Sequence, residues 1–321
     1  MNELESPHSF GDWAVVALTA HFRKITKYDQ RVLEDQDPED LHQLRVGMRR
    51  LRTALVGFGA ALQLPPLVTE KRVGRMARVL GVLRDNDVLQ EIIANLGPIP
   101  ANEQDYLESV QDYLHQKRRQ AFKSTKKILT QKEYEDFKAQ MGRWLHQPQF
   151  TLLANYPIQD ILPDLLLPLL ADFFLHPGWL VLQEINPGND ASSPSLDLET
   201  LNESLAPWEK VLHDLRKSAK KTRYQLELFT RFYGADYQEL IERIKIVQDC
   251  LGQLQDYFVL AQVMEKSLAL DIATFAPQLT ALLAGDRLGA WQTWQPQQHY
   301  FLNTYHRHQC RLLLQSPQIL S

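Results

Sequence analysis

The stretch LHQLRVGMRRLRTAL, residues 41–55, decides the fold, because it joins regularly spaced leucines to one histidine and four arginines within fifteen residues. On a helix, at about 100° per residue, the leucines and Met48 collect on one narrow arc. His42, Arg45, Arg49 and Arg52 fall on a second arc, of roughly 80°, directly beside the first. The stretch therefore predicts a helix that buries its apolar face and holds a row of cations at the edge of that face.

The same pattern returns 171 residues later as LHDLRKSAKKTRYQL, residues 212–226. The leucines at 41, 44 and 55 align with leucines, and every cation of the first stretch aligns with a cation in the second. The aligned pairs are His42 with His213, Arg45 with Arg216, Arg49 with Lys220, Arg50 with Lys221, and Arg52 with Arg223.

A second motif repeats at the same offset. LGVLRDNDVL, residues 80–89, aligns without a gap with LGQLQDYFVL, residues 251–260, and Arg72 aligns with Arg243. Equal spacing across two helices and the turn between them indicates two tandem copies of one helical unit. We expect the copies to be related by a pseudo-two-fold axis.

Helical periodicity extends through most of the chain, whereas alternating β-branched runs and Asn-Gly or Asp-Gly turns are nearly absent. The predicted fold class is therefore all-α. The Pro-, Gly- and Ser-rich stretch at 184–197 is the clearest linker, so we expect a first repeat at 1–156, a connecting helix and linker at 157–197, and a second repeat at 198–321. The expected helices are 9–34, 38–62, 66–95, 102–128, 131–145, 158–175, 198–232, 236–267, 274–284 and 288–314.

Composition places the chain among soluble globular proteins. Of its 321 residues, 44% are hydrophobic and 23% charged, and 35 Lys and Arg against 39 Asp and Glu give a net charge of −4. A non-specific nucleic-acid coat protein is usually basic overall, so affinity for a polyanion must come from a local patch. The chain has only two cysteines and no export signal, which predicts a cytoplasmic protein. The apolar segment 161–182 contains aspartates and prolines, so we expect it not to span a membrane.

Charge is unbalanced between residues 42 and 84, where nine Lys or Arg face one acid, Glu70. A solvated helix face usually interleaves acids at i,i+4, so this patch predicts an anionic ligand. The alternative is that the arginines pair with carboxylates of neighbouring helices, such as Asp85 and Asp256. His42 and His213, at the starts of their helices, are either phosphate-facing groups or ordinary core and capping residues.

The two copies of His-x-x-Arg-x-x-x-(Arg/Lys)-(Arg/Lys)-x-Arg, each followed by its LG-x-L motif, resemble the CHAD domain, the conserved-histidine α-helical domain. The resemblance covers roughly residues 10–315. It implies two four-helix bundles with internal pseudo-symmetry. It also implies a non-catalytic module that binds inorganic polyphosphate, often at polyphosphate granules, through paired basic helix faces.

The resemblance also implies which residues contact phosphate. The second copy has Ile246, Asp249 and Gln255 where the first has Arg75, Arg78 and Arg84, so we expect its half of the site to be weaker. The implied set is His42, Arg45, Arg49, Arg50, Arg52, Arg72, Arg75 and Arg84 in the first copy, and His213, Arg216, Lys220, Lys221 and Arg223 in the second.

Three other functional classes compete with this one. A purely structural scaffold would need no exposed, unpaired cation row. Nucleic acid is the alternative partner, but a single-strand binder interleaves aromatic residues, and only Tyr224 lies within either cation stretch. An enzyme is disfavoured because EYEDFK, residues 133–138, misplaces the lysine of a triphosphate-tunnel motif and no Walker loop occurs. We expect no cofactor and no metal, although His306 and Cys310 are spaced to share a helix face.

One further basic run, KRRQAFKSTKK at 117–127, has two interpretations. It either extends the anion-binding surface or forms a solvated helix face. The sequence does not distinguish them, and it leaves the oligomeric state open.

Overall fold

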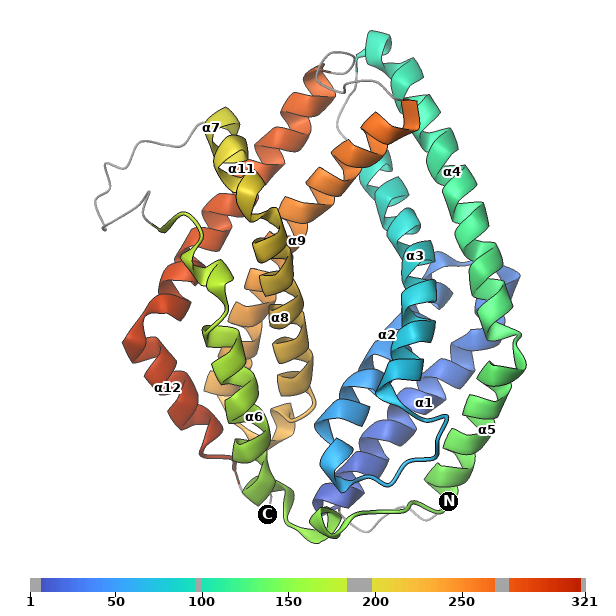
Figure 1. Ribbon diagram of the computed structural model, residues 1–321, viewed down its shortest axis with the longest axis vertical. Helices are drawn as coiled ribbons and strands as arrows, with labels where there is room; N and C mark the ends of the chain where they lie inside the picture. Colours follow the sequence, from blue (N-terminus) through green and yellow to red (C-terminus); the bar gives the residue numbers. More distant parts are fainter. Residues whose placement is uncertain (1–6, 96–99, 184–197, 269–276, 319–321) are drawn as a thin grey trace. The chain divides into compact units, whose positions relative to one another are not determined.

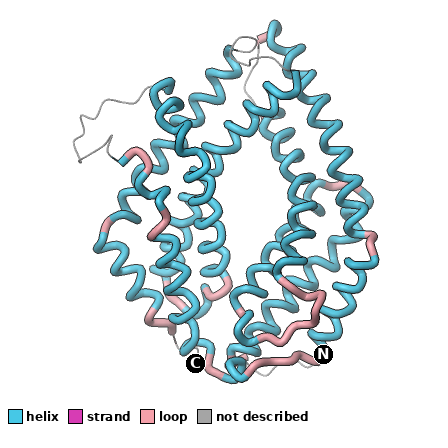
Figure 2. The backbone as a smooth tube through the Cα atoms, in the orientation of Figure 1, coloured by secondary structure: helices cyan, strands magenta, loops and turns pink. Residues whose placement is uncertain are grey.

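The computed structural model describes residues 7–95, 100–183, 198–268 and 277–318 (Figure 1). For residues 198, 199, 256–268 and 279–286 it describes the backbone alone. Within these ranges the protein consists of helices and loops, with no β-strand (Figure 2). The all-α fold class predicted from the sequence is therefore confirmed.

The chain divides into two compact units, which are described separately. Unit 1 comprises residues 1–97 and 111–161, and unit 2 comprises residues 98–110 and 162–321. The predicted repeats follow sequence similarity, whereas these units follow packing, and the two divisions differ at 98–110 and 162–197. That the repeats arose by duplication stays a prediction.

Unit 1 is built around three helices that pack in sequence order, α1 on α2 and α2 on α3 (Figure 1). A fourth helix, α4, contributes its second half, and α5 packs on α1. The bounds are α1 Phe10–Glu34, α2 Pro38–Gly57, α3 Glu70–Ala94, α4 Ala101–Leu129 and α5 Lys132–His146, with short 3-10 turns η1 Gly59–Ala61 and η2 Leu152–Asn155.

Capping residues fix where these helices begin. Ser9 and Asp12 form a reciprocal capping box at the start of α1, and the Asp37 side chain accepts from the Glu39 N–H at the start of α2. α3 begins at Glu70 rather than at the predicted residue 66, because Thr69 caps it through the Arg72 N–H.

The core of unit 1 receives the leucine face of α2, as the periodicity predicts: Leu44, Met48 and Leu51 are fully buried. α5 is tied to α1 by a polar contact inside this core. The buried carboxylate of Asp29 accepts hydrogen bonds from the Tyr134 hydroxyl and the Lys138 ammonium, each at 3.0 Å.

Unit 2 is built around α8, which packs on α9, and α9, which also packs on α11 (Figure 1). Its aromatic core includes Trp179 stacked on Trp294, with ring centroids 5.2 Å apart. The bounds are α6 Ile158–Phe174, which starts in unit 1, α7 Leu198–Leu205, α8 Glu209–Glu227, α9 Ala235–Leu268, α11 Pro277–Leu302 and α12 Thr304–Leu314, with 3-10 turns η3 Pro177–Leu180, η5 Ala206–Trp208 and η6 Thr230–Phe232.

Two helix predictions in unit 2 are wrong in their boundaries. The single helix expected at 198–232 is divided by η5, which contains Pro207, a residue with no N–H for a helical hydrogen bond. The break expected near residue 285 lies instead at Asn303, whose side chain accepts from the N–H groups of Tyr305 and His306 and so begins α12.

The segment 98–110 joins unit 2 through buried side chains. Val110 is fully buried, and the buried carboxylate of Glu103 accepts from the Gln278 N–H at the start of α11. This contact places a negative charge at the positive end of a helix dipole.

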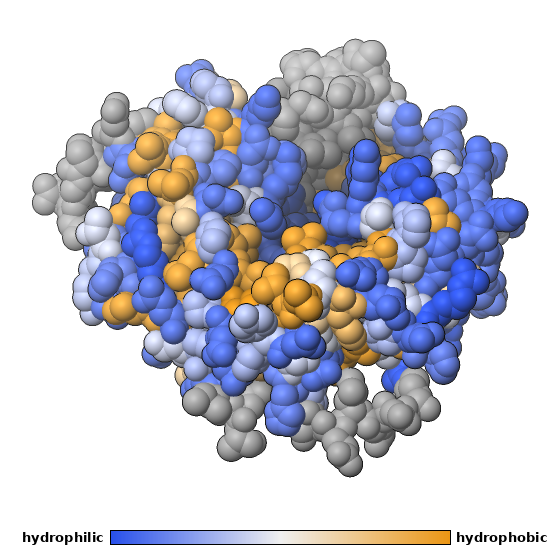
Figure 3. Space-filling model, turned by 60° about the horizontal axis from the view of Figure 1, so that its bottom comes forward, coloured by the Kyte–Doolittle hydropathy of each residue, from blue (hydrophilic) through white to orange (hydrophobic). Residues whose placement is uncertain are grey.

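The surface over α4 and α5, at the right of Figure 3, is predominantly hydrophilic. Elsewhere in unit 1, the loop before α6 exposes apolar side chains such as Leu152 and Tyr156. In the part of the chain that the structure describes, no helix is both long enough and apolar enough to cross a bilayer.

Candidate polyanion-binding site

The thirteen predicted residues lie on three helices. Those of 41–55 lie on α2 and form what we call the first cation row, and those of 212–226 lie on α8 and form the second cation row. The first cation row is His42, Arg45, Arg49, Arg50 and Arg52, the second is His213, Arg216, Lys220, Lys221 and Arg223, and Arg72, Arg75 and Arg84 lie on α3.

The guanidinium group of Arg45 lies directly against α3 at Gly81. A Cβ added to Gly81 would lie only 2.7 Å from Arg45 Nη1, which is closer than side chains approach one another. Gly81 is therefore needed for this placement. The glycine leaves room for a cation that is still partly exposed at the junction of two helices, with a side-chain exposure of 28%.

The same relation holds in unit 2 at the same offset. Arg216 of α8 lies against Gly252 of α9, whose added Cβ would lie 3.1 Å from Arg216 Nη2. Arg45 and Gly81 each lie 171 positions before Arg216 and Gly252, so the contact between arginine and glycine repeats at the same offset as the sequence. Each unit thus holds an arginine of its cation row over a glycine of the following helix at the repeated position, and in unit 1 Arg52 also lies against Gly74 of α3, whose added Cβ would lie 3.2 Å from Arg52 Nε.

Gln255 organises the start of the second cation row. Its Oε1 contacts His213 Nδ1 and accepts a hydrogen bond of 3.0 Å from Arg216 Nη1. Gln255 aligns with Arg84 of the first copy, and the loss of an arginine there is one reason to expect a weaker second half. In the structure the glutamine instead supplies an acceptor that orients two site residues. Because an amide is neutral, it does so without cancelling their charge.

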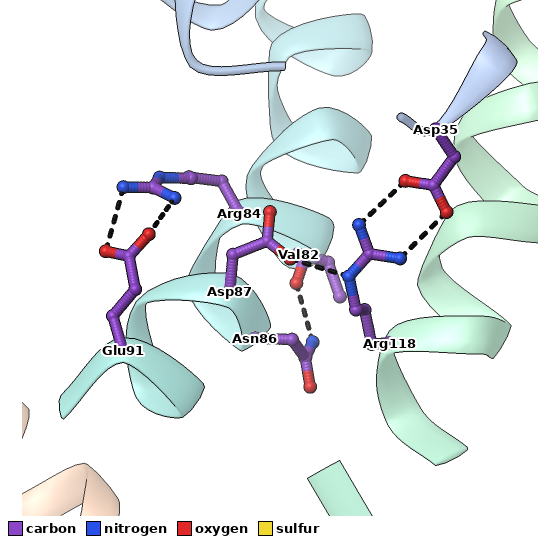
Figure 4. Close-up of polar contacts among 7 residues, drawn as sticks. All are labelled: Asp35, Val82, Arg84, Asn86, Asp87, Glu91 and Arg118. Atoms are coloured by element: carbon purple, nitrogen blue, oxygen red, sulfur yellow. Dashed lines mark hydrogen bonds and ion pairs between the residues drawn. The ribbon is translucent and has the colours of Figure 1, made fainter. Parts of the chain in front are cut away.

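Carboxylates balance part of the charge in unit 1. Arg52 pairs with Glu70, and both Arg72 and Arg75 pair with Glu133 of α5. Arg84 forms a bidentate pair with Glu91, at 2.7 and 3.1 Å (Figure 4). The alternative considered from the sequence, pairing with carboxylates of neighbouring helices, therefore holds for Arg52, Arg72 and Arg75, whereas Arg84 pairs within its own helix.

The ion pair between Arg45 Nη2 and Asp85 Oδ1 is long, at 4.0 Å, and its carboxylate is mostly exposed. A pair this long and this exposed contributes little. The side chain of Asp256, the partner expected in the second copy, lies outside the described residues.

Arg50 and Lys221 occupy the same position in the two rows, and both are exposed. Among the described residues neither has a carboxylate within ion-pair distance. In the second row, Arg223 lies 3.3 Å from Glu227 and over the Tyr224 ring, at 4.6 Å from its centroid. Each row therefore contains both balanced cations and cations open to a ligand.

Two residues of α1, His21 and Lys24, lie near the first cation row, and the sequence analysis missed them; Lys24 Cβ is 3.5 Å from the position of a Cβ added to Gly47 of α2. Burial, with the charges of Arg50 and Lys24, lowers the pKa of His21 to about 4. Burial also lowers the pKa of His42. The charge of Glu39 raises this pKa, and the charges of Arg84, Arg49 and Lys24 lower it further. The i,i+3 spacing of His21 and Lys24 on the predicted helix 9–34 was the signal available in the sequence.

Arg118, from the basic run at 117–127, has a structural role. It donates 2.7 and 2.8 Å bonds to Asp35, the left-handed C-cap of α1, and a 2.8 Å bond to the buried Asp87 of α3 (Figure 4). Burial raises the pKa of Asp87, and the contact with Arg118 opposes that rise. Arg118 therefore ties α4 to α1 and α3 rather than facing a ligand.

The pair His306 and Cys310, considered for metal binding, has other contacts. His306 stacks on Tyr300 with ring centroids 4.2 Å apart, and Cys310 is buried, which raises the pKa of its thiol. Among the described residues, no group of three or more His, Cys, Asp or Glu side chains is arranged to hold a metal ion.

Comparison with known families decides the classification. The family model of the CHAD domain matches residues 16–265, which contain both cation rows and both arginine–glycine pairs. The chain belongs to the CHAD family. The resemblance predicted from the two motifs is confirmed.

Two solved structures resemble this CHAD protein in fold. The CHAD domain from the plant Ricinus communis aligns with a TM-score of 0.56 and 21% identity, over 99% of this chain and 96% of that one. PptA from Streptomyces chartreusis aligns with a TM-score of 0.63 and 15% identity, over 92% of this chain and all of that one. A search of curated proteins finds no match to the chain.

Proposed function

We propose that this CHAD protein binds inorganic polyphosphate through its two cation rows and catalyses no reaction on it. The observation that carries the proposal is the repeated placement of an arginine over a glycine, Arg45 over Gly81 and Arg216 over Gly252. Each guanidinium is held at an exposed helix junction, beside a cation that no described carboxylate neutralises. Family membership supports the same interpretation.

The chemistry of the rows suits a flexible chain of phosphates. Arg guanidinium groups bind phosphate oxygens through paired hydrogen bonds, and Lys ammonium groups act as point charges. A row of such groups needs no base to recognise. Each phosphate engaged after the first is an effectively intramolecular contact, so affinity should rise with chain length.

Nucleic acid is the competing ligand, and one observation disfavours it. Tyr224, the aromatic residue within the second cation row, is buried, and Arg223 lies over its ring. It is therefore not exposed for base stacking, which supplies much of the affinity for single strands. Direction of the protein to polyphosphate granules in the cytoplasm is part of the same proposal.

Calorimetric titration tests the proposal directly. Long-chain polyphosphate, triphosphate and single-stranded DNA are titrated at two salt concentrations into the wild type and into two double variants, Arg45→Ala/Arg50→Ala and Arg216→Ala/Lys221→Ala. The matched control is Arg31→Ala/Lys245→Ala, which removes two exposed cations that are each paired with a carboxylate.

We expect polyphosphate to bind more tightly than DNA, with affinity that falls steeply as salt rises. Each row variant should lose at least tenfold in affinity, about 1.4 kcal/mol, while the control should change little. Equal affinity for DNA, or equal losses in the row and control variants, would overturn the proposal.

A further inference from the structure

The second half of α4 carries a dense set of cations outside both rows. Between residues 113 and 132 there are seven Lys or Arg and no Asp or Glu. Six of them are exposed: Lys117, Arg119, Lys123, Lys126 and Lys127 on α4, and Lys132 at the start of α5. Arg119, Lys123, Lys126 and Lys127 lie within about 100° of one another around α4, and we call these four residues the α4 cation face.

The α4 cation face points away from the core of unit 1. Leu114, Ala121, Thr125 and Leu129 are buried on one side of α4. At about 100° per residue, the middle of that side lies roughly 150° around the helix from the middle of the α4 cation face.

Arg118 shows which side of α4 meets its neighbours, because it bonds to Asp35 of α1 and Asp87 of α3. On the helix it lies about 125° from the middle of the α4 cation face. The face is therefore directed away from α1 and α3. Since α3 packs with α2, the face forms a surface separate from the first cation row.

Helix stability does not account for these residues. Lys126 and Lys127 lie in the last turn of α4, where they interact favourably with the helix dipole. Arg119 and Lys123 lie before that turn and gain nothing from it. The i,i+4 pairs Arg119–Lys123 and Lys123–Lys127 each cost a few tenths of a kcal/mol in repulsion.

The face also lacks local counter-charges. Some lysines on other helices are paired three residues away, Lys217 with Asp214 and Lys245 with Glu242, both at 2.8 Å or less, whereas others, such as exposed Lys221, have no such partner among the described residues. Among the described residues, no carboxylate lies within ion-pair distance of the four cations of the α4 face.

We propose that the α4 cation face is a second polyphosphate-contact surface on unit 1, which engages a stretch of the chain that the first cation row does not hold. This inference rests on the proposed function. Four cations span about 12 Å of helix, which suits an extended polyanion.

The chemistry disfavours other occupants. A membrane-surface helix carries large apolar residues opposite its cations, and that side of α4 is already buried in unit 1. A protein interface has an apolar centre, and the surface over α4 is hydrophilic (Figure 3). An exposed row composed mainly of lysines, without aromatic residues, fits repeated phosphate contacts best.

The two surfaces predict a dependence on chain length. A short chain that fits one row gains nothing from the α4 cation face, whereas a long chain can reach both surfaces and gain avidity. The test variant is Lys123→Gln/Lys126→Gln, because glutamine keeps the helix propensity and removes the charge. The control is Arg31→Gln/Lys245→Gln, which removes two cations that are already paired.

Titrations with triphosphate, with polyphosphate of about one hundred residues and with single-stranded DNA are compared by calorimetry, and circular dichroism is the check on folding. We expect the test variant to keep wild-type affinity for triphosphate and to lose threefold to tenfold for the long chain. Its salt slope for the long chain should fall by about one for each lysine that contacts phosphate.

Wild-type affinity of the test variant for the long chain would overturn the inference. So would an equal loss for both ligands, because the face would then belong to the same site as the first cation row. If the variant loses affinity for single-stranded DNA but not for polyphosphate, the face serves nucleic acid and the inference is wrong. Failure of the proposed function itself is distinguishable, since the wild type would then not prefer polyphosphate at all.

Discussion

Replacing Gly81 by alanine should weaken anion binding without weakening the fold. The added Cβ would lie 2.7 Å from Arg45 Nη1, so the guanidinium must move away from α3. Because Nη1 is the far end of a flexible side chain, the move itself costs little. Alanine in a helix interior is more stable than glycine by about 0.5–1 kcal/mol.

Gly81→Ala should therefore lower the affinity for anions while it raises the stability of the helix. We expect the free energy of unfolding of unit 1 to stay constant or rise by up to about 1 kcal/mol. A charge-assisted hydrogen bond contributes about 1.5–3 kcal/mol, so displacement of Arg45 should weaken polyphosphate binding by about tenfold to a hundredfold. Urea denaturation followed by circular dichroism measures the first quantity, and calorimetric titration with short polyphosphate measures the second.

Gly142→Ala is the matched control, because an added Cβ there meets no atom within 4 Å and Gly142 lies inside α5, away from the cation rows. It should bring the same gain in stability and leave binding unchanged. Unchanged binding in Gly81→Ala would refute the assignment of Arg45 as a phosphate contact. A loss of more than about 2 kcal/mol in stability would show that Gly81 serves helix packing instead.

Three further outcomes follow from the charges of unit 1. Arg50→Gln should reduce polyphosphate affinity more than Arg52→Gln does in parallel titrations, because a carboxylate already neutralises Arg52; equal losses would contradict this. Arg118→Met should destabilise unit 1 by about 3 kcal/mol in urea denaturation, because it leaves buried Asp87 unpaired; a neutral effect would show that water replaces the pair. The pKa of His21 is lowered to about 4 in the folded protein, so between pH 6.5 and 4 this histidine is protonated in the unfolded chain but not in the fold. The free energy of unfolding should therefore fall by up to about 3 kcal/mol as the pH drops from 6.5 to 4. His21→Gln should flatten that fall, and an unchanged pH profile would exclude this histidine as its cause.

The sequence predicts the helices well because their apolar periodicity is long and regular. The predicted start of α2 agrees with the structure because Asp37 and Pro38 are strong local signals. The error at Asn303 has the opposite cause: Pro296 lies within α11, so neither proline nor hydrophobic pattern marks the true break. Capping by an asparagine side chain is a weaker signal than either.

The cation rows were predictable because they repeat in the sequence. The carboxylates that pair with the arginines of the site were not predictable. Glu133 is 61 residues from Arg72 in the sequence, yet it pairs with that arginine and with Arg75. Such a contact depends on how α5 packs on the unit, which spacing alone does not specify. The same reason explains why Gln255 was interpreted as a lost cation, whereas the structure shows it bonded to a site residue.

The assignment of residues 98–110 to unit 2 has a consequence for biosynthesis. Val110 is buried in that unit and Glu103 caps α11, so the second unit needs a segment that leaves the ribosome before the first unit is complete. A fragment starting after the linker would lack these residues, and a fragment ending there would leave them without their partners. The two halves are alike in sequence pattern, but a cut at the linker would separate the second unit from a segment that packs within it.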